Sequence, residues 1–291
     1  MGPDFAARFG ESRDAVPQSL QVLFRDPIRF DAGLLARMLS EIPSLGDVRV
    51  ELVSVADHPV AGTLVSPAGP PASVLALIEW GPHRIKLAGF DAPMPYGPVE
   101  VCVGPAMIPP PLKHDSKYHA AHVLLYYAGT EPFPLERYVA LGAVASVLAR
   151  FDAIVVMHEE ARTAVQALDL IPEEGEDILQ TLRTLPIPLL WGGFVKMDTG
   201  TPERPWVRSF ANHRLGLPDL AYQLKDHAET ARTFQVFSGM LGYIRELQES
   251  FTPGDTVDLG DGTRFQFRLP TEAEWFLESE ATLLVLEKLD E

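Results

Sequence analysis

The fold is decided by residues 73–90, SVLALIEWGPHRIKLAGF. Two apolar runs, Ser73–Trp80 and Arg84–Phe90, are rich in branched aliphatic and aromatic residues, which favour β-strands. They flank Gly81-Pro82-His83, a combination that predicts a tight turn. We therefore expect two neighbouring strands that run in opposite directions.

The segments around this pair extend the pattern. A β-prone apolar run predicts a buried strand at Ser19–Arg25, and alternating apolar and charged residues predict a half-buried strand at Val48–Val55. Between them, apolar residues spaced near 3.6 predict an amphipathic helix over 32–42. A further strand is expected at Val99–Val103. This β-α-β-β-β order is typical of an antiparallel sheet with its helix on one face.

The rest of the chain continues to mix helices and strands. Helices are expected over 161–168, 174–185 and 228–249, with another long helix that starts at Pro134. Strands are expected at His122–Tyr127, Ala153–Met157, Pro188–Met197, Trp206–Ala211, Ala221–Leu224 and Thr282–Leu289. The turn Gly260-Asp261-Gly262 separates two β-prone runs and predicts a hairpin over 256–269.

These elements predict an α+β fold: antiparallel sheets with helices on one face, a pattern compatible with two degenerate ferredoxin-like halves. We expect an N-terminal arm, 1–17, followed by a single α+β domain, 18–291. The proline-rich stretch 105–111 is the best boundary between two sub-halves, 18–104 and 112–291.

Charge and composition exclude several functions. The chain has 24 basic and 40 acidic residues, a net charge of −16, which argues against binding to nucleic acid or to an anionic membrane. No apolar run reaches the roughly 18–20 residues of a membrane span, and no glycine-rich nucleotide-binding motif follows a strand. Cys102 is the single cysteine, so no internal disulfide can form, and we expect a cytoplasmic protein without a cofactor.

The segment 114–122 contains three histidines, His114, His119 and His122. On a helix, His119 and His122 would share a face and could chelate a metal ion. Asp115, or His158 with the two glutamates that follow it, could complete such a site. The alternative is a polar linker whose histidines are solvated or cap the following strand. No HExxH motif accompanies them.

A second polar cluster lies in the segment 204–214 and contains Arg204, Trp206, Arg208, His213 and Arg214. Loops on a rigid sheet often carry binding residues, and Trp and Arg are enriched at interface hot spots. Arg208, His213 and Arg214 therefore predict an anion-binding or catalytic edge, and the loop Lys196–Arg208, with Trp206 between Arg204 and Arg208, predicts a protein-binding site. In the alternative, Trp206 turns into the core as the first residue of its strand, and the arginines form surface ion pairs that contribute about 0–1 kcal/mol each.

Parts of the chain resemble an uncharacterised bacterial family, catalogued as domain of unknown function 4261. The resemblance is carried by Leu189-Leu190-Trp191, the segment Arg208–Leu217 with its continuation to Leu220, the helix 228–249 and the hairpin at Asp261-Gly262. It extends over about 110–270, including Ala121-His122-Val123, with weaker similarity at Ala92-Pro93-Met94-Pro95. Asp219 only loosely matches the acidic residue of the family pattern. These motifs are structural, so the resemblance implies a fold and no active-site residues.

Two functions remain open. The first is a non-enzymatic protein-binding module, in one form an immunity-type protein that neutralises a basic partner. An acidic surface steers basic partners, and no motif meets the spacing required for nucleophilic, metal or nucleotide chemistry. The second is a hydrolase that uses the histidine-rich segment 114–122, with or without bound metal. The oligomeric state does not follow from the sequence.

Overall fold

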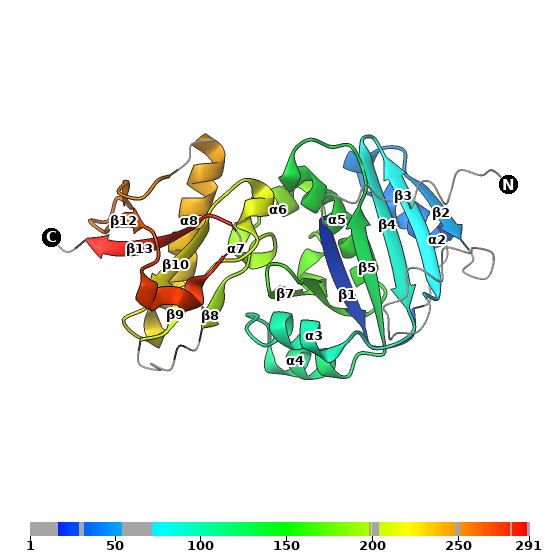
Figure 1. The fold of residues 1–291 in the computed structure, drawn as a ribbon. Helices are drawn as coiled ribbons and strands as arrows, with labels where there is room; N and C mark the ends of the chain where they lie inside the picture. The colour runs from blue at the N-terminus through cyan, green and yellow to red at the C-terminus, as the bar shows by residue number, and fades with distance from the viewer. Residues whose placement is uncertain are drawn as a thin grey trace. The chain divides into compact units, whose positions relative to one another are not determined.

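A computed structural model describes residues 17–28, 32–53, 72–197, 199, 204–247, 251–279 and 281–289 (Figure 1). These residues form helices and predominantly antiparallel sheets, which confirms the predicted α+β class. The predicted N-terminal arm lies outside the described residues except for Pro17. No helix in the described part of the chain is both long and apolar enough to cross a bilayer.

The chain forms two compact units. The first contains the described residues up to Glu159 together with Ala164–Thr184, and the second contains Glu160–Thr163 together with the described residues from Leu185 onward. This division differs from the predicted boundary at 105–111. Residues on both sides of that stretch pair within one sheet, and the structure does not confirm two ferredoxin-like halves.

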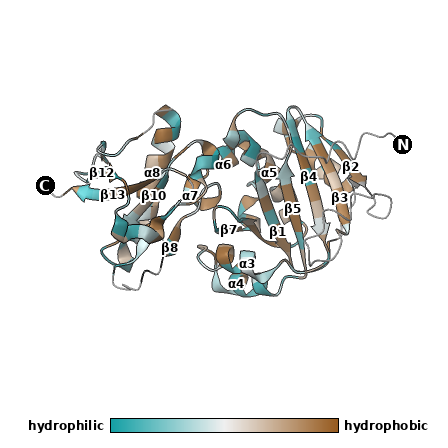
Figure 2. Cartoon of the chain, viewed as in Figure 1, coloured by the Kyte–Doolittle hydropathy of each residue, from teal (hydrophilic) through white to brown (hydrophobic). Residues whose placement is uncertain are grey.

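The first sheet has the strand order β2-β3-β4-β5-β1-β6-β7 among the described residues. Its strands are β1 (Ser19–Phe24), β2 (Arg49–Val53), β3 (Val74–Trp80), β4 (His83–Phe90), β5 (Ala121–Tyr127), β6 (Ala153–His158) and β7 (Thr163–Gln166). The α-helices of the first unit are α2 (Ala32–Ser40), α3 (Tyr96–Val103), α4 (Pro110–Lys117), α5 (Pro134–Ala149) and α6 (Ile178–Thr184). Short 3-10 helices are η1 (Pro43–Leu45) and η3 (Ala167–Leu170). Figure 2 shows hydrophobic residues along β1, β3 and β5.

The predicted hairpin at 73–90 is confirmed. Trp80 pairs with His83, so the turn consists of two residues, Gly81 and Pro82, and His83 already belongs to β4. Gly81 has a φ of +47°. Glycine adopts this left-handed conformation without steric cost, which is why the turn can be this tight.

Helices pack on both faces of the first sheet, so the prediction of helices on one face is wrong here. Tyr138 of α5 hydrogen-bonds His158 of β6, whereas α3 and α4 pack against Val155 and Met157 of the same strand. Neighbouring residues of a strand point to opposite faces. The two contacts therefore lie on opposite sides of β6.

The predicted strand at Val99–Val103 is also wrong, because these residues belong to α3. Val99, Cys102 and Val103 are buried while Glu100 and Val101 are exposed, a spacing of three and four residues that a helix places on one face. Pro98 lies in the first turn, where proline is tolerated because that N–H has no partner within the helix.

The second sheet has the strand order β11-β12-β13-β10-β9-β8. Its strands are β8 (Val195–Met197), β9 (Trp206–Arg208), β10 (Asp219–Gln223), β11 (Thr256–Asp258), β12 (Arg264–Arg268) and β13 (Leu283–Leu289). The helices of this unit are α7 (Ile187–Leu190), α8 (Thr230–Leu247), η4 (Asn212–Leu215), η5 (His227–Glu229) and η6 (Glu272–Leu277). The hairpin over 256–269 and the helix over 228–249 are confirmed, and β10 and β13 pair in parallel.

Two further predictions are corrected where the backbone departs from regular geometry. The expected helix over 161–168 is instead β7 followed by η3, because Arg162 has a φ of +54° that interrupts a right-handed helix. The expected strand at Pro188–Met197 is α7 followed by β8. Gly192 and Gly193 separate the two and approach neighbouring backbone and side chains closely.

We predict that Gly193→Ala destabilises the second unit by about 1–3 kcal/mol or more. The N–H of Gly193 donates to the carbonyl oxygen of Phe210 at 2.9 Å, and a Cβ atom at position 193 would overlap the carbonyl group of Ala161. Urea denaturation of the full chain measures the effect. The matched control is Gly239→Ala in α8, where nothing lies within 4 Å of an added Cβ. That change should stabilise by up to about 1 kcal/mol, and equal effects of both variants would contradict the prediction.

Candidate functional sites

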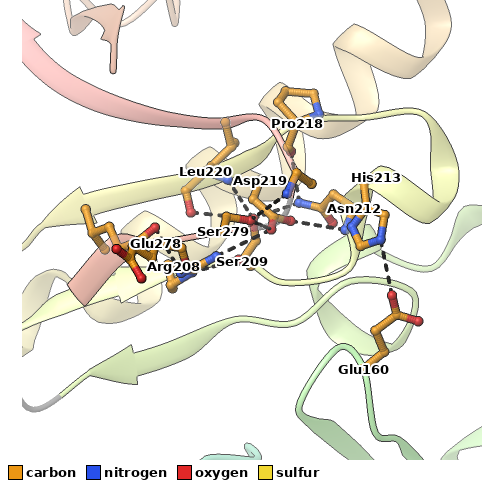
Figure 3. A network of polar contacts seen from close by, with 12 residues as sticks. Glu160, Arg208, Ser209, Asn212, His213, Pro218, Asp219, Leu220, Glu278 and Ser279 are labelled. Carbon is orange, nitrogen blue, oxygen red and sulfur yellow. Dashed lines mark hydrogen bonds and ion pairs between the residues drawn. The ribbon is translucent and has the colours of Figure 1, made fainter. Parts of the chain in front are cut away.

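A buried ion pair lies at the centre of the predicted cluster 204–214. Arg208 on β9 and Asp219 at the start of β10 approach to 3.5 Å, and their side chains are 4% and 3% exposed (Figure 3). The guanidinium group of Arg208 also donates to the carbonyl oxygens of Leu277 and Glu278 at 3.2 and 3.0 Å. It stacks on the ring of Phe210 at 4.1 Å. This arginine therefore links β9, β10 and the end of η6.

Hydrogen bonds from Asn212 close the loop between β9 and β10. Its backbone N–H donates to a carboxylate oxygen of Asp219 at 3.1 Å, and its side-chain amide donates to Ser209 Oγ at 2.7 Å and to the carbonyl oxygen of Pro218 at 3.1 Å (Figure 3). Within the described residues, Asn212 Oδ1 has no hydrogen-bond partner, and it lies against Gly192, where a Cβ atom would overlap it.

Burial opposes the charge on both members of the ion pair. It raises the pKa of Asp219, while the Asn212 N–H and the Arg208 charge act in the other direction. Burial likewise lowers the pKa of Arg208, opposed by the charge of Asp219. Removing one member of such a pair leaves the other buried without compensation. The arrangement is that of a structural anchor.

The five residues predicted for this site differ in burial and in their partners. Trp206 and Arg208 are buried, whereas Arg204 is exposed. His213 and Arg214 lie nearer the surface, where both contact the carboxylate of Glu160, at 3.2 and 2.8 Å. The buried position of Trp206 supports the core interpretation of its role.

The histidines of 114–122 also lie on different elements. His114 is in α4, His119 follows that helix, and His122 is in β5, so His119 and His122 do not share a helix face as the metal hypothesis required. Asp115 pairs with Arg25 at 2.6 Å. No group of three or more His, Cys, Asp or Glu side chains able to hold a metal ion occurs in the described part of the chain.

The ring nitrogens of the two buried histidines form hydrogen bonds with backbone groups. His119 Nε2 accepts from the N–H of Met94 at 2.7 Å, so its Nδ1 carries the proton that is donated to the carbonyl oxygen of Ser116, also at 2.7 Å. His122 Nδ1 lies 2.8 Å from the carbonyl oxygen of Ala92, and its ring stacks on Phe90. These bonds fix the chain between β4 and β5.

A surface that the sequence analysis missed covers α3, α4 and the loop between them. Four large apolar side chains are exposed there: Tyr96, Val101, Met107 and Tyr118, the last with 74% of its surface accessible. The buried side of the same segment packs on β6 through Val99, Cys102, Val103, Ala106 and Ile108. One feature of the sequence could have indicated this apolar surface, because Val101–Leu112 contains no charged residue. Only the helical assignment shows which of its residues point outward.

Polar contacts hold this surface together. Glu100 of α3 accepts from the Tyr96 hydroxyl at 2.6 Å and pairs with Lys117 of α4 at 3.4 Å. The hydrogen bond from Tyr96, assisted by Lys117, lowers the pKa of Glu100, which therefore stays ionised at neutral pH. Lys113 donates to the carbonyl oxygen of Gly104 at 2.7 Å, at the end of α3. Glu100 and Lys117 are thus engaged with one another, and Lys113 is engaged with a backbone carbonyl group.

Comparisons with known proteins identify no relative of this chain. No protein family model, no curated protein and no solved structure matches the chain. The resemblance to domain of unknown function 4261 stays a prediction, and the sites described above stand on their geometry.

The second prediction separates anchors from surface residues in the cluster 204–214. Arg208→Ala should destabilise the fold by about 3–5 kcal/mol because it leaves Asp219 unpaired in the interior. Trp206→Ala should cost a similar amount, about 3–5 kcal/mol, by creating a cavity. Arg204→Ala is the matched control and should change stability by no more than about 0.5 kcal/mol. Thermal and urea denaturation measure all three, and a stable Arg208→Ala protein would contradict the anchor role.

The third prediction concerns pH. Burial lowers the pKa of His119 and of His122 below the value of about 6.5 found in unfolded chains. Between the two values the unfolded chain binds more protons, so the free energy of unfolding should decrease as pH falls below about 7. Urea denaturation at pH 7.5 and 5.5 measures this decrease. It should be smaller in His119→Gln and unchanged in His114→Gln, whose histidine is exposed; identical decreases in both variants would contradict the assignment.

Proposed function

We propose that the protein is a non-enzymatic binding module that acts in the cytoplasm and recognises a basic protein partner through α3 and α4. The observation that carries the proposal is the exposure of Tyr96, Val101, Met107 and Tyr118 on one short segment. An immunity-type neutraliser of a basic partner is one form of this function. The absence of internal disulfides, with a single cysteine buried at Cys102, agrees with a reducing compartment.

The residue types on this surface are those that interfaces use. Tyrosine and methionine are enriched at the centre of protein–protein interfaces, whereas lysine and glutamate are depleted there. A tyrosine exposes a large amphipathic area and loses little conformational entropy on binding, since its side chain has only two rotatable bonds. Tyr118, the most exposed of the four, directly follows the C-terminus of α4.

The rigidity of the segment also favours binding. The ion pair between Glu100 and Lys117 joins α3 to α4, and Lys113 holds the end of α3. An apolar cluster on β6 fixes the other side of both helices. A surface that is already ordered needs less ordering entropy on binding than a loop would.

Charge indicates the kind of partner. The net charge of −16 attracts basic proteins over a distance of about one Debye length, roughly 8–10 Å at physiological salt. Charges close to the four apolar side chains are engaged with one another, so they do not oppose an apolar contact. We therefore infer a partner with an apolar patch surrounded by lysine or arginine residues, whose association slows as salt increases.

The second hypothesis, a hydrolase that uses 114–122, draws no support from this geometry. Both nitrogens of His119 are engaged by backbone groups, and His122 bonds the carbonyl oxygen of Ala92. His158, the suggested additional ligand, is buried against Tyr138 at 3.1 Å. No observation on the described residues favours catalysis by this segment.

The fourth prediction tests the binding surface. A photo-crosslinking amino acid at position 118, expressed in the native host, should capture a protein with a basic isoelectric point. With that protein purified, Tyr118→Ser and Tyr96→Ser should each raise its dissociation constant at least tenfold, because loss of a hot spot costs about 1.4 kcal/mol or more. The melting temperature of Tyr118→Ser should stay nearly unchanged, since Tyr118 is largely exposed.

Leu269→Ser is the matched control, because Leu269 is an exposed apolar residue of the second unit. It should leave the dissociation constant unchanged, and crosslinking from position 269 should not capture the same protein. A partner that binds Tyr118→Ser and Tyr96→Ser as tightly as the unaltered chain would contradict the proposed surface.

A further inference from the structure

Two buried histidines join the ends of the segment that carries α3 and α4. His119 is 4% and His122 is 7% exposed, and their rings lie 6.4 Å apart, edge to face. His119 follows α4, yet its ring binds the N–H of Met94, two residues before the start of α3, at 2.7 Å. The inference below concerns the regulation of the surface on α3 and α4, and in that respect it rests on the proposed function.

The position of the proton on His119 follows from its two partners. The backbone N–H of Met94 can only donate, so Nε2 of the ring accepts and carries no proton. The carbonyl oxygen of Ser116 can only accept, so Nδ1 carries the proton that is donated to it at 2.7 Å. The imidazole is therefore neutral in the folded chain, with its proton on Nδ1.

Protonation of Nε2 removes the link to Met94. An imidazolium has two N–H donors and no acceptor, so its Nε2–H would face the Met94 N–H across 2.7 Å. Two donors cannot share a hydrogen bond, and both would be buried without an acceptor. His122 differs, because it donates from Nδ1 to the carbonyl oxygen of Ala92, a bond that the protonated ring retains. The link through His119 is thus the one that acid breaks.

This link lies close to both exposed tyrosines. Met94 precedes Tyr96 by two residues, and Ser116 precedes Tyr118 by two residues. The neutral ring of His119 therefore holds the start of α3 against the end of α4, where these tyrosines are exposed. The Met94 side chain also belongs to the apolar cluster that packs α3 and α4 on β6. Loss of the link loosens the surface where it is anchored.

No carboxylate compensates a positive charge on these rings. Burial lowers the pKa of His119, opposed only by its bond to Ser116. Burial also lowers the pKa of His122, opposed by its bond to Ala92, and the charge of His119 lowers it further. Tyrosines aside, the other ionisable groups described on the surrounding elements are Arg25 after β1, His83, Arg84 and Lys86 on β4, Asp91 after β4, Glu100 and Cys102 on α3, and His114, Asp115 and Lys117 on α4.

The carboxylates of the two joined segments have other partners. Asp115 pairs with Arg25 at 2.6 Å, and Asp91 accepts from the N–H of Ile28 at 3.0 Å. An open form, in which the two rings meet water, therefore binds protons more strongly than the closed form. Below a pH of about 6.5, the usual pKa of histidine, acid favours opening.

We propose that His119 is an acid-sensitive latch: its protonation frees Met94, opens the segment between β4 and β5, and so disrupts the partner-binding surface on α3 and α4. Between pH 7.5 and 5.5, each histidine can shift the equilibrium towards the open form by at most about tenfold, and both together by about a hundredfold. The partner is lost in proportion to the fraction of open molecules.

Amide hydrogen exchange of the full chain, followed by NMR, tests the latch. The protection factor, which corrects for the intrinsic effect of pH on exchange, should fall severalfold at the Met94 amide between pH 7.5 and 5.5, up to about a hundredfold. The amide of Tyr127, which donates to the carbonyl oxygen of Gln18 in the same sheet, is the internal reference and should fall less. Equal falls at both amides would mean that the histidines affect only global unfolding, and the latch would be overturned.

His119→Gln supplies an acceptor for the Met94 N–H that does not titrate, so the part of the fall caused by His119 should disappear. His114→Gln is the matched control and should keep the whole fall, because His114 is an exposed histidine of α4. The ring ¹⁵N shifts of the unaltered chain do not depend on whether a variant folds. At pH 7.5 they should show the proton of His119 on Nδ1, and a proton on Nε2 overturns the latch.

The partner captured through position 118 gives the functional readout. Its dissociation constant should rise from pH 7.5 to 5.5 with the unaltered chain, and should rise less with His119→Gln. The same rise with both proteins would overturn the regulatory inference and leave the proposed function standing. If no partner is captured, the proposed function fails, whereas the exchange experiment still decides whether the latch exists.

Discussion

The first unit depends on the hydrogen bonds along both edges of β1. Val22 of this strand lies opposite Val123 of β5 and opposite Val156 of β6, so a segment near the start of the chain joins two strands that follow it by more than a hundred residues. The hairpin of β3 and β4, together with the edge strand β2, joins the other described strands of the sheet through β5. No sub-half of the sequence can therefore complete this sheet alone, because its core exists only once these distant segments pair.

That constraint also places the connection between β4 and β5. These two strands are neighbours in the sheet, although 30 residues lie between Phe90 and Ala121. The intervening residues include α3 and α4, which pack on the face of β6 opposite to α5. His119 and His122 join the two ends of this connecting segment, because they form hydrogen bonds with backbone groups of the residues that follow β4. The histidines that resembled a metal site in the sequence thus fix the helices that carry the exposed apolar surface.

Buried polar groups in the second unit also have a structural role, like His119 and His122 in the first. Arg208, Asp219 and Asn212 each satisfy backbone groups or one another, and burial penalises the charged state of the ion pair. Apart from Asn212 Oδ1, the polar atoms of this network are engaged, so a ligand would have to replace hydrogen bonds already formed.

The sequence by itself determined the α+β class, both hairpins and the long helix α8, because turn residues and apolar periodicity act over a few neighbours. Periodicity did not distinguish a strand from a short helix at Val99–Val103, because five residues are too few to separate the two patterns. The burial of Val99, Cys102 and Val103 in the folded chain fits a helix. In the sequence, Arg208 and His119 lie near other polar residues, which suggested functional sites. Only their hydrogen-bond partners in the folded chain show that both residues have a structural role. Tertiary structure alone decided that Arg49 of β2, Glu79 of β3 and Arg84 of β4 lie side by side, because strand register brings together residues whose spacing in the chain carries no signal.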